Sequence, residues 1–461
     1  MRTPDIQLRQ TLRAALQRGP MSNRELEAAA HVSAATAKRI LHELQADLIS
    51  AGETRRRKHA LRRQVRGTLS TIETFAIDAK GRATRSADVE LIQPGGCHAL
   101  LDPLVWPQES RQGGWWEGLP YPFHDMRPQG YLGRIVAQAV GPALNVSAEP
   151  DHWSDDDALW FLANIGSDTP GNLIIGEKAM QLWTRTRTQL DAISARALKR
   201  EYVQRAQSAL KQAGAGSSAG GEFPKFTAAR SLASASTPHV IVKFSAGDRT
   251  GAARRWADLL VCEHLAAQAI SAMDGHFAAR TRIIEAEGRT FLESERFDRH
   301  AEEGRSALVS LSAIEAALVG AGPQPWPAVL RSTAGAPFFE PGVRDRVEEL
   351  WWFGRFIANS DMHTGNLSFR PKGATFDLAP AYDMLPMRYG PLRGGDVPDP
   401  EFAVHDLPMP PRDGQERWSK VLQAAIEFWR EAARDSRISA EFRAVCASNA
   451  NALGQWSQHW G

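Results

Sequence analysis

One polar segment constrains this chain more than any other, because it sets three oxygen-bearing side chains at fixed spacing. Residues 357–369 read IANSDMHTGNLSF, in which Asp361 is followed five residues later by Asn366. A second acidic residue, Asp383, stands in the segment LAPAYDMLP. Phosphoryl transfer needs a carboxylate at the acceptor hydroxyl and oxygen ligands for Mg²⁺. The spacing predicts such a site, and the alternative is that these Asx residues only stabilise turns.

A strand with one central lysine lies upstream, behind a stretch rich in glycine and serine. The strand HVIVKF carries Lys243, and the stretch contains Gly220 and Gly221. Backbone N–H groups and an ammonium can together neutralise phosphate charge. The stretch contains neither GxxxxGK[ST] nor GxGxxG, and a flexible linker is the alternative. The order of these segments nevertheless matches the nucleotide- and metal-binding segments of protein-kinase-like folds.

The first 67 residues differ from the rest in charge. They hold 14 Lys and Arg against 6 Asp and Glu, a net charge of +8, which leaves −6 for the remainder of a chain whose total is +2. A basic head on an acidic body suggests contact with nucleic acid at one end. The alternative is a solvated charged surface.

Local signals in this head predict three helices. Apolar spacing favours a helix over residues 6–18. Ser22 and Glu25 form a capping-box pattern at the start of a helix over Asn23–Ala30, and a third helix is predicted over Ala34–Asp47. Helix, short turn and helix is the helix-turn-helix pattern.

A basic run follows the third helix and suggests a hairpin wing. The whole head resembles the winged helix-turn-helix of bacterial transcription regulators, with the alternative of a helical protein-interaction module. We expect duplex DNA to bind residues 1–66. The third helix would present Thr36, Lys38 and Arg39 to the major groove, and the wing would bring Arg55, Arg56, Arg57 and Lys58 to phosphates.

The sequence after residue 67 predicts a mixed α+β body. The protein is expected in a reducing compartment. Period-two alternation predicts strands at 71–77 and 87–93, and the pattern from 150 to 210 is helical. The three cysteines are far apart, which argues against a disulfide framework or zinc cluster. The sequence contains neither a signal-peptide pattern nor an apolar window long enough to span a bilayer. We therefore expect a cytoplasmic protein with no membrane contact.

Five segments together resemble the HipA-like serine/threonine kinases, the toxin components of bacterial toxin–antitoxin systems. They are SSAGGEFPK, HVIVKF, LESERFDRH, NSDMHTGN and LAPAYDML, and the resemblance covers roughly residues 70–440. It is closest to the type with an added N-terminal DNA-binding-like domain. The implied fold is a bilobal protein-kinase-like body behind a winged helix-turn-helix. The implied domains are residues 1–66, an N-lobe at 67–298 with a Gly-rich loop at 214–225, and a mainly helical C-lobe at 299–461.

The resemblance also implies roles for individual residues. Lys243, Gly220 and Gly221 would contact the phosphates of ATP, and Glu295 and Phe297 would lie at the hinge beside adenine. Asp361 would be the catalytic aspartate, and Asn366 and Asp383 would bind Mg²⁺. Ser217, with Ser218 as the alternative, stands where the family has an autophosphorylated serine.

Three departures from the family pattern leave points open. The lysine of the Gly-rich loop, Lys225, is displaced by one position, and the usual His-x-Lys-Asn reads His363-Thr-Gly-Asn. The usual glutamate partner of the strand lysine is not in register, so both Asp258 and Glu263 are candidates for that role.

The implied function is ATP- and Mg²⁺-dependent phosphorylation of a protein, in this family an aminoacyl-tRNA synthetase or another translation component, with growth arrest as the outcome. The implied partners include an antitoxin; a separate antitoxin and the fused head are both candidates for that role. Two rival functions remain. One is a DNA-binding regulator whose kinase-like domain is inactive and senses nucleotide, and the other is a small-molecule phosphotransferase.

Overall fold

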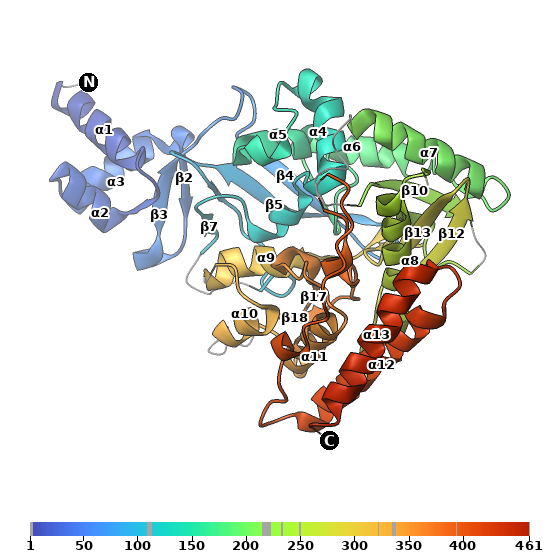
Figure 1. Ribbon diagram of the computed structural model, residues 1–461. Helices are drawn as coiled ribbons and strands as arrows, with labels where there is room; N and C mark the ends of the chain where they lie inside the picture. The colour runs from blue at the N-terminus through green and yellow to red at the C-terminus, as the bar shows by residue number, and fades with distance from the viewer. Residues whose placement is uncertain are drawn as a thin grey trace.

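The computed structural model describes residues 3–107, 113–213, 223–231, 234–248, 250–320, 322–333, 338–392 and 394–460. It has a mixed α+β architecture, as predicted, in which separate β-sheets alternate with groups of helices along the chain (Figure 1). Among the described residues, the model contains no helix that is long and apolar enough to cross a membrane.

The N-terminal unit packs three helices on a small antiparallel sheet of order β1-β3-β2. Both hydrogen bonds of the predicted Ser22–Glu25 capping box are present. The third helix was predicted to reach Asp47 but ends at Glu43, because Leu44 leaves the helical conformation and the chain turns into a strand whose Leu48 packs in the same core. The elements are α1 (Thr3–Leu16), α2 (Asn23–Ala30), α3 (Ala34–Glu43), β1 (Met21–Ser22), β2 (Leu48–Ala51) and β3 (Lys58–Leu61).

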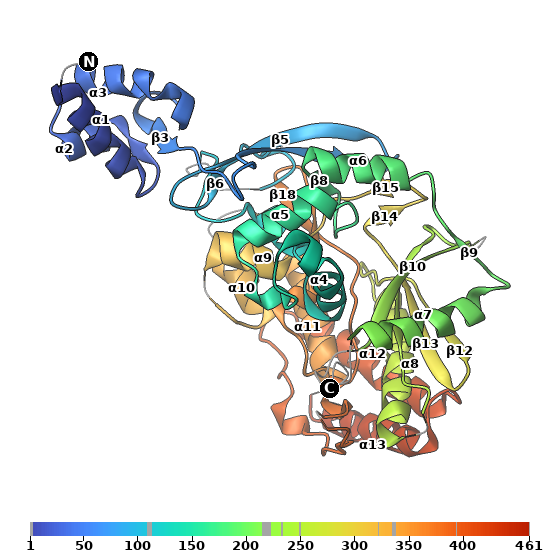
Figure 2. The ribbon, with the colours of Figure 1, turned by 90° about the horizontal axis from the view of Figure 1, so that it is seen from above.

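This unit projects from one end of the molecule (Figure 2), and an apolar cluster joins its sheet to the rest. Ile49 and Ala60 of its sheet pack against Ile92, and Trp115 covers the cluster. The Gln93 amide donates to the carbonyl of Leu61 at 2.9 Å, so backbone hydrogen bonding continues across the junction.

A five-stranded antiparallel sheet of order β7-β6-β5-β4-β8 forms the middle of the chain. The predicted strand at 71–77 is confirmed, and the strand predicted at 87–93 begins earlier and ends at Leu91. The purely helical pattern predicted for 150–210 is wrong at two places, because Leu173–Ile175 and Ile193–Ser194 pair with distant strands. The elements are β4 (Thr71–Ile77), β5 (Ala83–Leu91), β6 (Cys97–His98), β7 (Trp115–Trp116), α4 (Gly130–Leu144), α5 (Asp155–Ile165), β8 (Leu173–Ile175) and α6 (Glu177–Thr186).

A second five-stranded sheet, of order β12-β13-β11-β10-β9, carries the predicted lysine strand. Helix α7 packs on this sheet, and the long helix α8 connects β11 to β12 (Figure 1). The elements are β9 (Ile193–Ser194), α7 (Leu198–Ala213), β10 (Lys225–Ser231), β11 (His239–Phe244), α8 (Gly251–Ala272), β12 (Thr281–Ala286) and β13 (Arg289–Glu295).

The C-terminal third is mainly helical, with two small sheets inserted. Its strands β17 and β18 follow the segment that contains Asp361 and Asn366, and β16 pairs with β17. The elements are β14 (Arg299–His300), β15 (Gly304–Arg305), β16 (Val309–Ser310), α9 (Leu311–Ile314), α10 (Trp326–Ser332), α11 (Val343–Phe356), β17 (Ser368–Lys372), β18 (Thr375–Leu378), α12 (Gln415–Arg434) and α13 (Ala440–Ser457).

Candidate active site

Lys243 lies at the centre of a buried charge cluster. Its Nζ atom donates to both carboxylate oxygens of Glu263, at 2.7 and 2.8 Å, and also contacts Asp383 directly. The side chains of Lys243 and Glu263 are 9% and 7% exposed, whereas that of Asp383 is 29% exposed. The cluster therefore joins a strand, a helix and a C-terminal loop that are far apart in the sequence.

The structure resolves the open question of the lysine partner in favour of Glu263. Asp258 lies on the same helix, α8, but its carboxylate accepts hydrogen bonds from the amide and hydroxyl of Ser439, both at 2.7 Å. It thus caps the start of α13 and is not available to the lysine. Because the two acidic residues are five positions apart, they leave the helix in different directions.

Burial and charge act against each other in this cluster. Burial alone would lower the pKa of Lys243, but the Asp383 and Glu263 carboxylates hold it above its ordinary value. Burial would raise the pKa of Asp383, yet the lysine holds it at about 2. Burial raises the pKa of Glu263 to about 7, against the effect of Lys243. One ammonium facing two carboxylates leaves an excess negative charge, so one carboxyl group retains its proton to higher pH.

The segment around Asp361 forms a loop held by short-range hydrogen bonds. The Asp361 amide donates to Oδ1 of the buried Asn359 at 3.0 Å, and the Asn366 side-chain amide donates to the carbonyl of Asp361 at 2.8 Å. The Asp361 side chain is exposed. The backbone is therefore fixed while the carboxylate faces solvent, which suits a group that must meet a substrate.

Two contacts connect this loop to the segment of Asp383. Asn359, which holds Asp361, also donates to the carbonyl of Asp383 at 3.4 Å. The Tyr382 hydroxyl donates to the carbonyl of Gly365 at 2.8 Å. Asp383 itself has φ of 55°, a left-handed conformation that is uncommon outside glycine. The three residues predicted from their spacing thus lie on two hydrogen-bonded loops, one of which reaches Lys243.

The two residues predicted at the adenine hinge have different surroundings. Phe297 is half-buried, and its ring contacts that of Tyr382 in a tilted arrangement, with centroids 5.7 Å apart. The Glu295 carboxylate accepts from Arg230 at 2.9 Å and from the Ser236 hydroxyl at 2.6 Å. Phe297 therefore adjoins the Asp383 loop, whereas the Glu295 carboxylate is engaged in a neighbouring network.

Sequence reasoning missed several residues that complete this site. Lys225 lies directly opposite Lys243 in the β10–β11 pair, and its charge also lowers the pKa of Asp383. The Phe223 ring lies 5.6 Å from the Lys243 ammonium. Both belong to the segment EFPKF, in which Lys225 begins β10, so the displaced lysine was the available signal. Trp326, which donates to the carbonyl of His363 at 3.0 Å, had no such signal.

Four predicted residues lie outside the part of the chain that the structure describes. They are the loop glycines Gly220 and Gly221 and the serines Ser217 and Ser218. Their predicted roles in phosphate contact and autophosphorylation stay predictions.

The residues predicted to contact DNA lie on the N-terminal unit. Lys38 and Arg39 are exposed on α3, and Arg39 also pairs with Glu43 at 2.8 Å. The Thr36 hydroxyl is 3.0 Å from that of Ser33, at the start of the same helix. Arg55, Arg56, Arg57 and Lys58 follow β2 and lead into β3, and the side chains of Arg56, Arg57 and Lys58 are exposed.

Comparison with known proteins decides the family. Residues 68–184 match the model of the YjjJ-like toxin middle domain, and residues 217–453 match the HipA-like C-terminal domain. The chain is 35% identical over 432 residues to Toxin YjjJ of Escherichia coli (strain K12), covering 93% of this chain and 94% of that protein. The chain belongs to the HipA-like toxin family.

A solved structure supports the fold of this HipA-like chain. It is that of the Shewanella oneidensis MR-1 toxin–antitoxin system HipA, HipB and its operator DNA complex, which matches at a TM-score of 0.52 and 16% identity over 83% of this chain and 96% of that chain. The resemblance seen in the sequence is thereby confirmed: the chain is a kinase-like toxin homologue.

Proposed function

We propose that this HipA-like chain is a Mg²⁺- and ATP-dependent serine/threonine protein kinase. The observation that carries the proposal is the buried Lys243–Glu263 ion pair next to Asp383. A lysine held by a helix glutamate is what kinase folds use to position nucleotide phosphates. Asp361 would orient the acceptor hydroxyl, since its carboxylate is exposed on a loop fixed by Asn359.

The donor set fits Mg²⁺, which prefers oxygen ligands. The Asn366 side-chain nitrogen is engaged with the Asp361 carbonyl, which turns its amide oxygen toward other partners. The Asp383 carboxylate contacts Lys243 through Oδ1, and its side chain is 29% exposed, so a cation can approach it from solvent. When bound, the metal would neutralise phosphate charge, and Lys243, Asn366 and Asp383 would hold the Mg·ATP complex.

We infer that the protein substrate is a translation component, such as an aminoacyl-tRNA synthetase, and that its phosphorylation arrests growth. This inference rests on family membership. We also infer an antitoxin partner, because the related HipA was solved with HipB and operator DNA.

We further propose that residues 1–66 form a winged helix-turn-helix that binds duplex DNA. Support comes from the order of three helices and an antiparallel hairpin, and from the exposed basic residues on α3 and between β2 and β3. Figure 2 shows that this unit projects from the body.

The kinase proposal is tested by transfer of labelled phosphate. Purified full-length protein is incubated with labelled ATP and Mg²⁺, with purified aminoacyl-tRNA synthetases and, separately, with a cell lysate. Asp361→Asn should keep the fold and lower transfer by at least ~10³-fold, since the group that orients the nucleophile is lost. Asp413→Asn, a change at an exposed residue of the C-terminal third, is the control and should leave transfer unchanged. Wild-type transfer by Asp361→Asn protein would contradict the proposal.

One observation favours a second candidate function. The basic residue that the family has before the loop asparagine is Gly365 in this chain. A nucleotide-sensing regulator with an inactive kinase-like domain would bind Mg·ATP and change its affinity for DNA without transferring phosphate. The same reaction separates the two candidates when it is run beside a DNA-binding titration with and without Mg·ATP.

A further inference from the structure

A polar cavity lies where the middle sheet meets the sheet of Lys243. It has a volume of about 340 Å³, which is within the range of small-molecule sites. Its walls come from the segment after α5, from α6 and α7, from β10 and β11, and from the β14–β15 hairpin. His239 lines it at one end of β11, whereas Lys243 is four residues along that strand, about 13 Å away at ~3.3 Å per residue.

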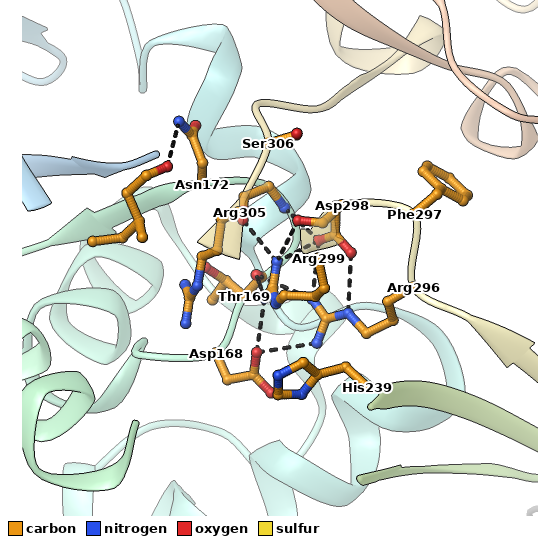
Figure 3. A network of polar contacts seen from close by, with 12 residues as sticks. Asp168, Thr169, Asn172, His239, Arg296, Phe297, Asp298, Arg299, Arg305 and Ser306 are labelled. Atoms are coloured by element: carbon orange, nitrogen blue, oxygen red, sulfur yellow. Dashed lines mark hydrogen bonds and ion pairs between the residues drawn. The ribbon is translucent and has the colours of Figure 1, made fainter. Parts of the chain in front are cut away.

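Part of the cavity wall is a satisfied network of buried charges (Figure 3). Asp298 accepts from Arg296 at 3.0 Å and from Arg299 at 2.6 Å. Asp168, whose side chain is 58% exposed, pairs with the same two arginines at 3.0 and 2.8 Å. These two guanidinium groups therefore have their counter-charges within the protein.

Arg305 lines the same cavity, but no carboxylate among the described residues forms an ion pair with it. It is only 5% exposed, and its Nη2 atom donates to the carbonyl of Ser167 at 2.7 Å. Its Nη1 atom is buried without a hydrogen-bond partner, and Arg305 forms no ion pair with any residue in the described ranges. Burial and the like charges of Arg299 and Arg296 lower the pKa of Arg305 to about 9, against the opposing effect of the Asp168 and Asp298 carboxylates. A buried charge of this kind is costly unless something neutralises it.

Two more arginines bring unused donors to the cavity. Arg187 contacts Glu303 at 3.3 Å through Nη1, but its Nε atom is buried without a partner. Arg205 lines the cavity from α7 and has neither a hydrogen bond nor an ion pair within the part of the chain that the structure describes. Three guanidinium groups from three separate segments thus have spare N–H donors around one space.

We propose that this cavity binds a phosphate group, either as the free ion or on a small monoester. Guanidinium groups match phosphate oxygens in geometry and stay charged, and several of them can share one tetrahedral anion. The exposed carboxylates Asp191 and Glu302 at the cavity wall disfavour a polyanion and can accept hydrogen bonds from hydroxyl groups. The cavity is lined by residues of the YjjJ-like middle domain, of the HipA-like domain and of the segment between them, to which Arg187 and Arg205 belong.

Isothermal titration of the full-length protein with inorganic phosphate, and separately with glycerol 3-phosphate at matched ionic strength, tests the proposal. We expect saturable binding of at least one probe. Arg205→Gln should weaken it by at least ~10-fold, as for loss of one charged hydrogen bond, with the unfolding midpoint unchanged because Arg205 has no partner to lose. Arg305→Gln should weaken it as well.

The matched control is Arg82→Gln, which removes a 73% exposed arginine just before β5 of the middle sheet and should leave binding unchanged. Tighter binding of glycerol 3-phosphate identifies a monoester as the ligand, and tighter binding of inorganic phosphate identifies the free ion. Absence of saturable binding of both probes, or equal affinities of wild-type and Arg205→Gln protein, would overturn the proposal.

Discussion

Replacing Lys243 by methionine should destabilise the fold, independently of any effect on activity. The substitution preserves much of the side-chain volume but leaves the Glu263 and Asp383 carboxylates close together without their shared cation. Removal of one partner from a buried ion pair costs about 3–5 kcal/mol. We expect the lower part of this range, because the Asp383 side chain is 29% exposed and retains some solvation.

The assay is urea unfolding of the full-length protein, followed by tryptophan fluorescence. The slope is about 1–3 kcal/mol/M for small proteins and increases with protein size, so a loss of 3 kcal/mol should move the midpoint of this larger chain down by up to ~1 M. Lys372→Met is the matched control, because that lysine is 64% exposed and pairs with Glu340 only at the surface. It should change the free energy of unfolding by no more than about 0.5 kcal/mol.

A second substitution separates charge from packing. Lys243→Met combined with Glu263→Gln removes one of the two unpaired carboxylates, so a large part of the lost stability should return. Such coupling is expected between residues in direct contact. If Lys243→Met is as stable as the Lys372→Met control, the Lys243–Glu263–Asp383 cluster does not stabilise the fold. If the double variant is no more stable than Lys243→Met alone, the loss comes from packing and not from charge.

Three further predictions concern the same site and the N-terminal unit. Asp383→Ala should weaken binding of Mg·ATP in calorimetry while nucleotide binding without Mg²⁺ changes little, and equal losses with and without the metal would argue against a metal ligand. Because the pKa of Glu263 is raised to about 7, its protonated form contributes stability that is present below its ordinary pKa and is lost as the pH rises through about 7. Glu263→Gln should remove that step from a pH series of unfolding curves, and persistence of the step would assign it to another group. For DNA binding by the N-terminal unit, a plot of the logarithm of affinity against the logarithm of salt concentration should have a slope of roughly −0.9 per contacted phosphate. Replacing residues 55–58 by alanine should make this slope shallower for all DNA sequences. No binding at low salt would exclude the DNA proposal.

The residues of the candidate site could be singled out from the sequence because each of its motifs is short and continuous. Lys243, Asp361 and Asn366 stand in segments whose residue types suffice to suggest their roles. The partner of Lys243 could not be chosen between Asp258 and Glu263, because the choice depends on how α8 is rotated in the fold. That rotation directs Asp258 to the start of α13, which is 181 residues away in the chain.

In the fold too, features that depend on neighbouring residues could be predicted, whereas features that depend on distant residues could not. The Ser22–Glu25 capping box and the alternating strand at 71–77 were predicted because both depend on neighbouring residues. Leu173–Ile175 was missed because three apolar residues between two helices carry no period of their own. It becomes a strand only because β4, about 100 residues earlier, pairs with it.

The segment ERFDRH was recognised as a family motif, but its structural role was not predicted. Its likeness to the family directed attention to nucleotide binding, yet most of its charges bind the segment that follows α5. Asp298 accepts from the Gly171 amide at 2.9 Å, and Arg299 donates to the Gly171 carbonyl at 2.9 Å. Arg296 reaches Asp168 at 3.0 Å (Figure 3).

These buried contacts bind the YjjJ-like middle domain to the HipA-like domain through charge as well as apolar packing. Removal of the middle domain would take Asp168 and the Gly171 backbone from Arg299, whose side chain is 2% exposed. Arg299 would then keep Asp298 as its ion-pair partner but lose its contacts across the two domains. Phe297, between Arg296 and Asp298, contacts the Tyr382 ring beside Asp383. The same short segment therefore connects the middle domain to the candidate active site.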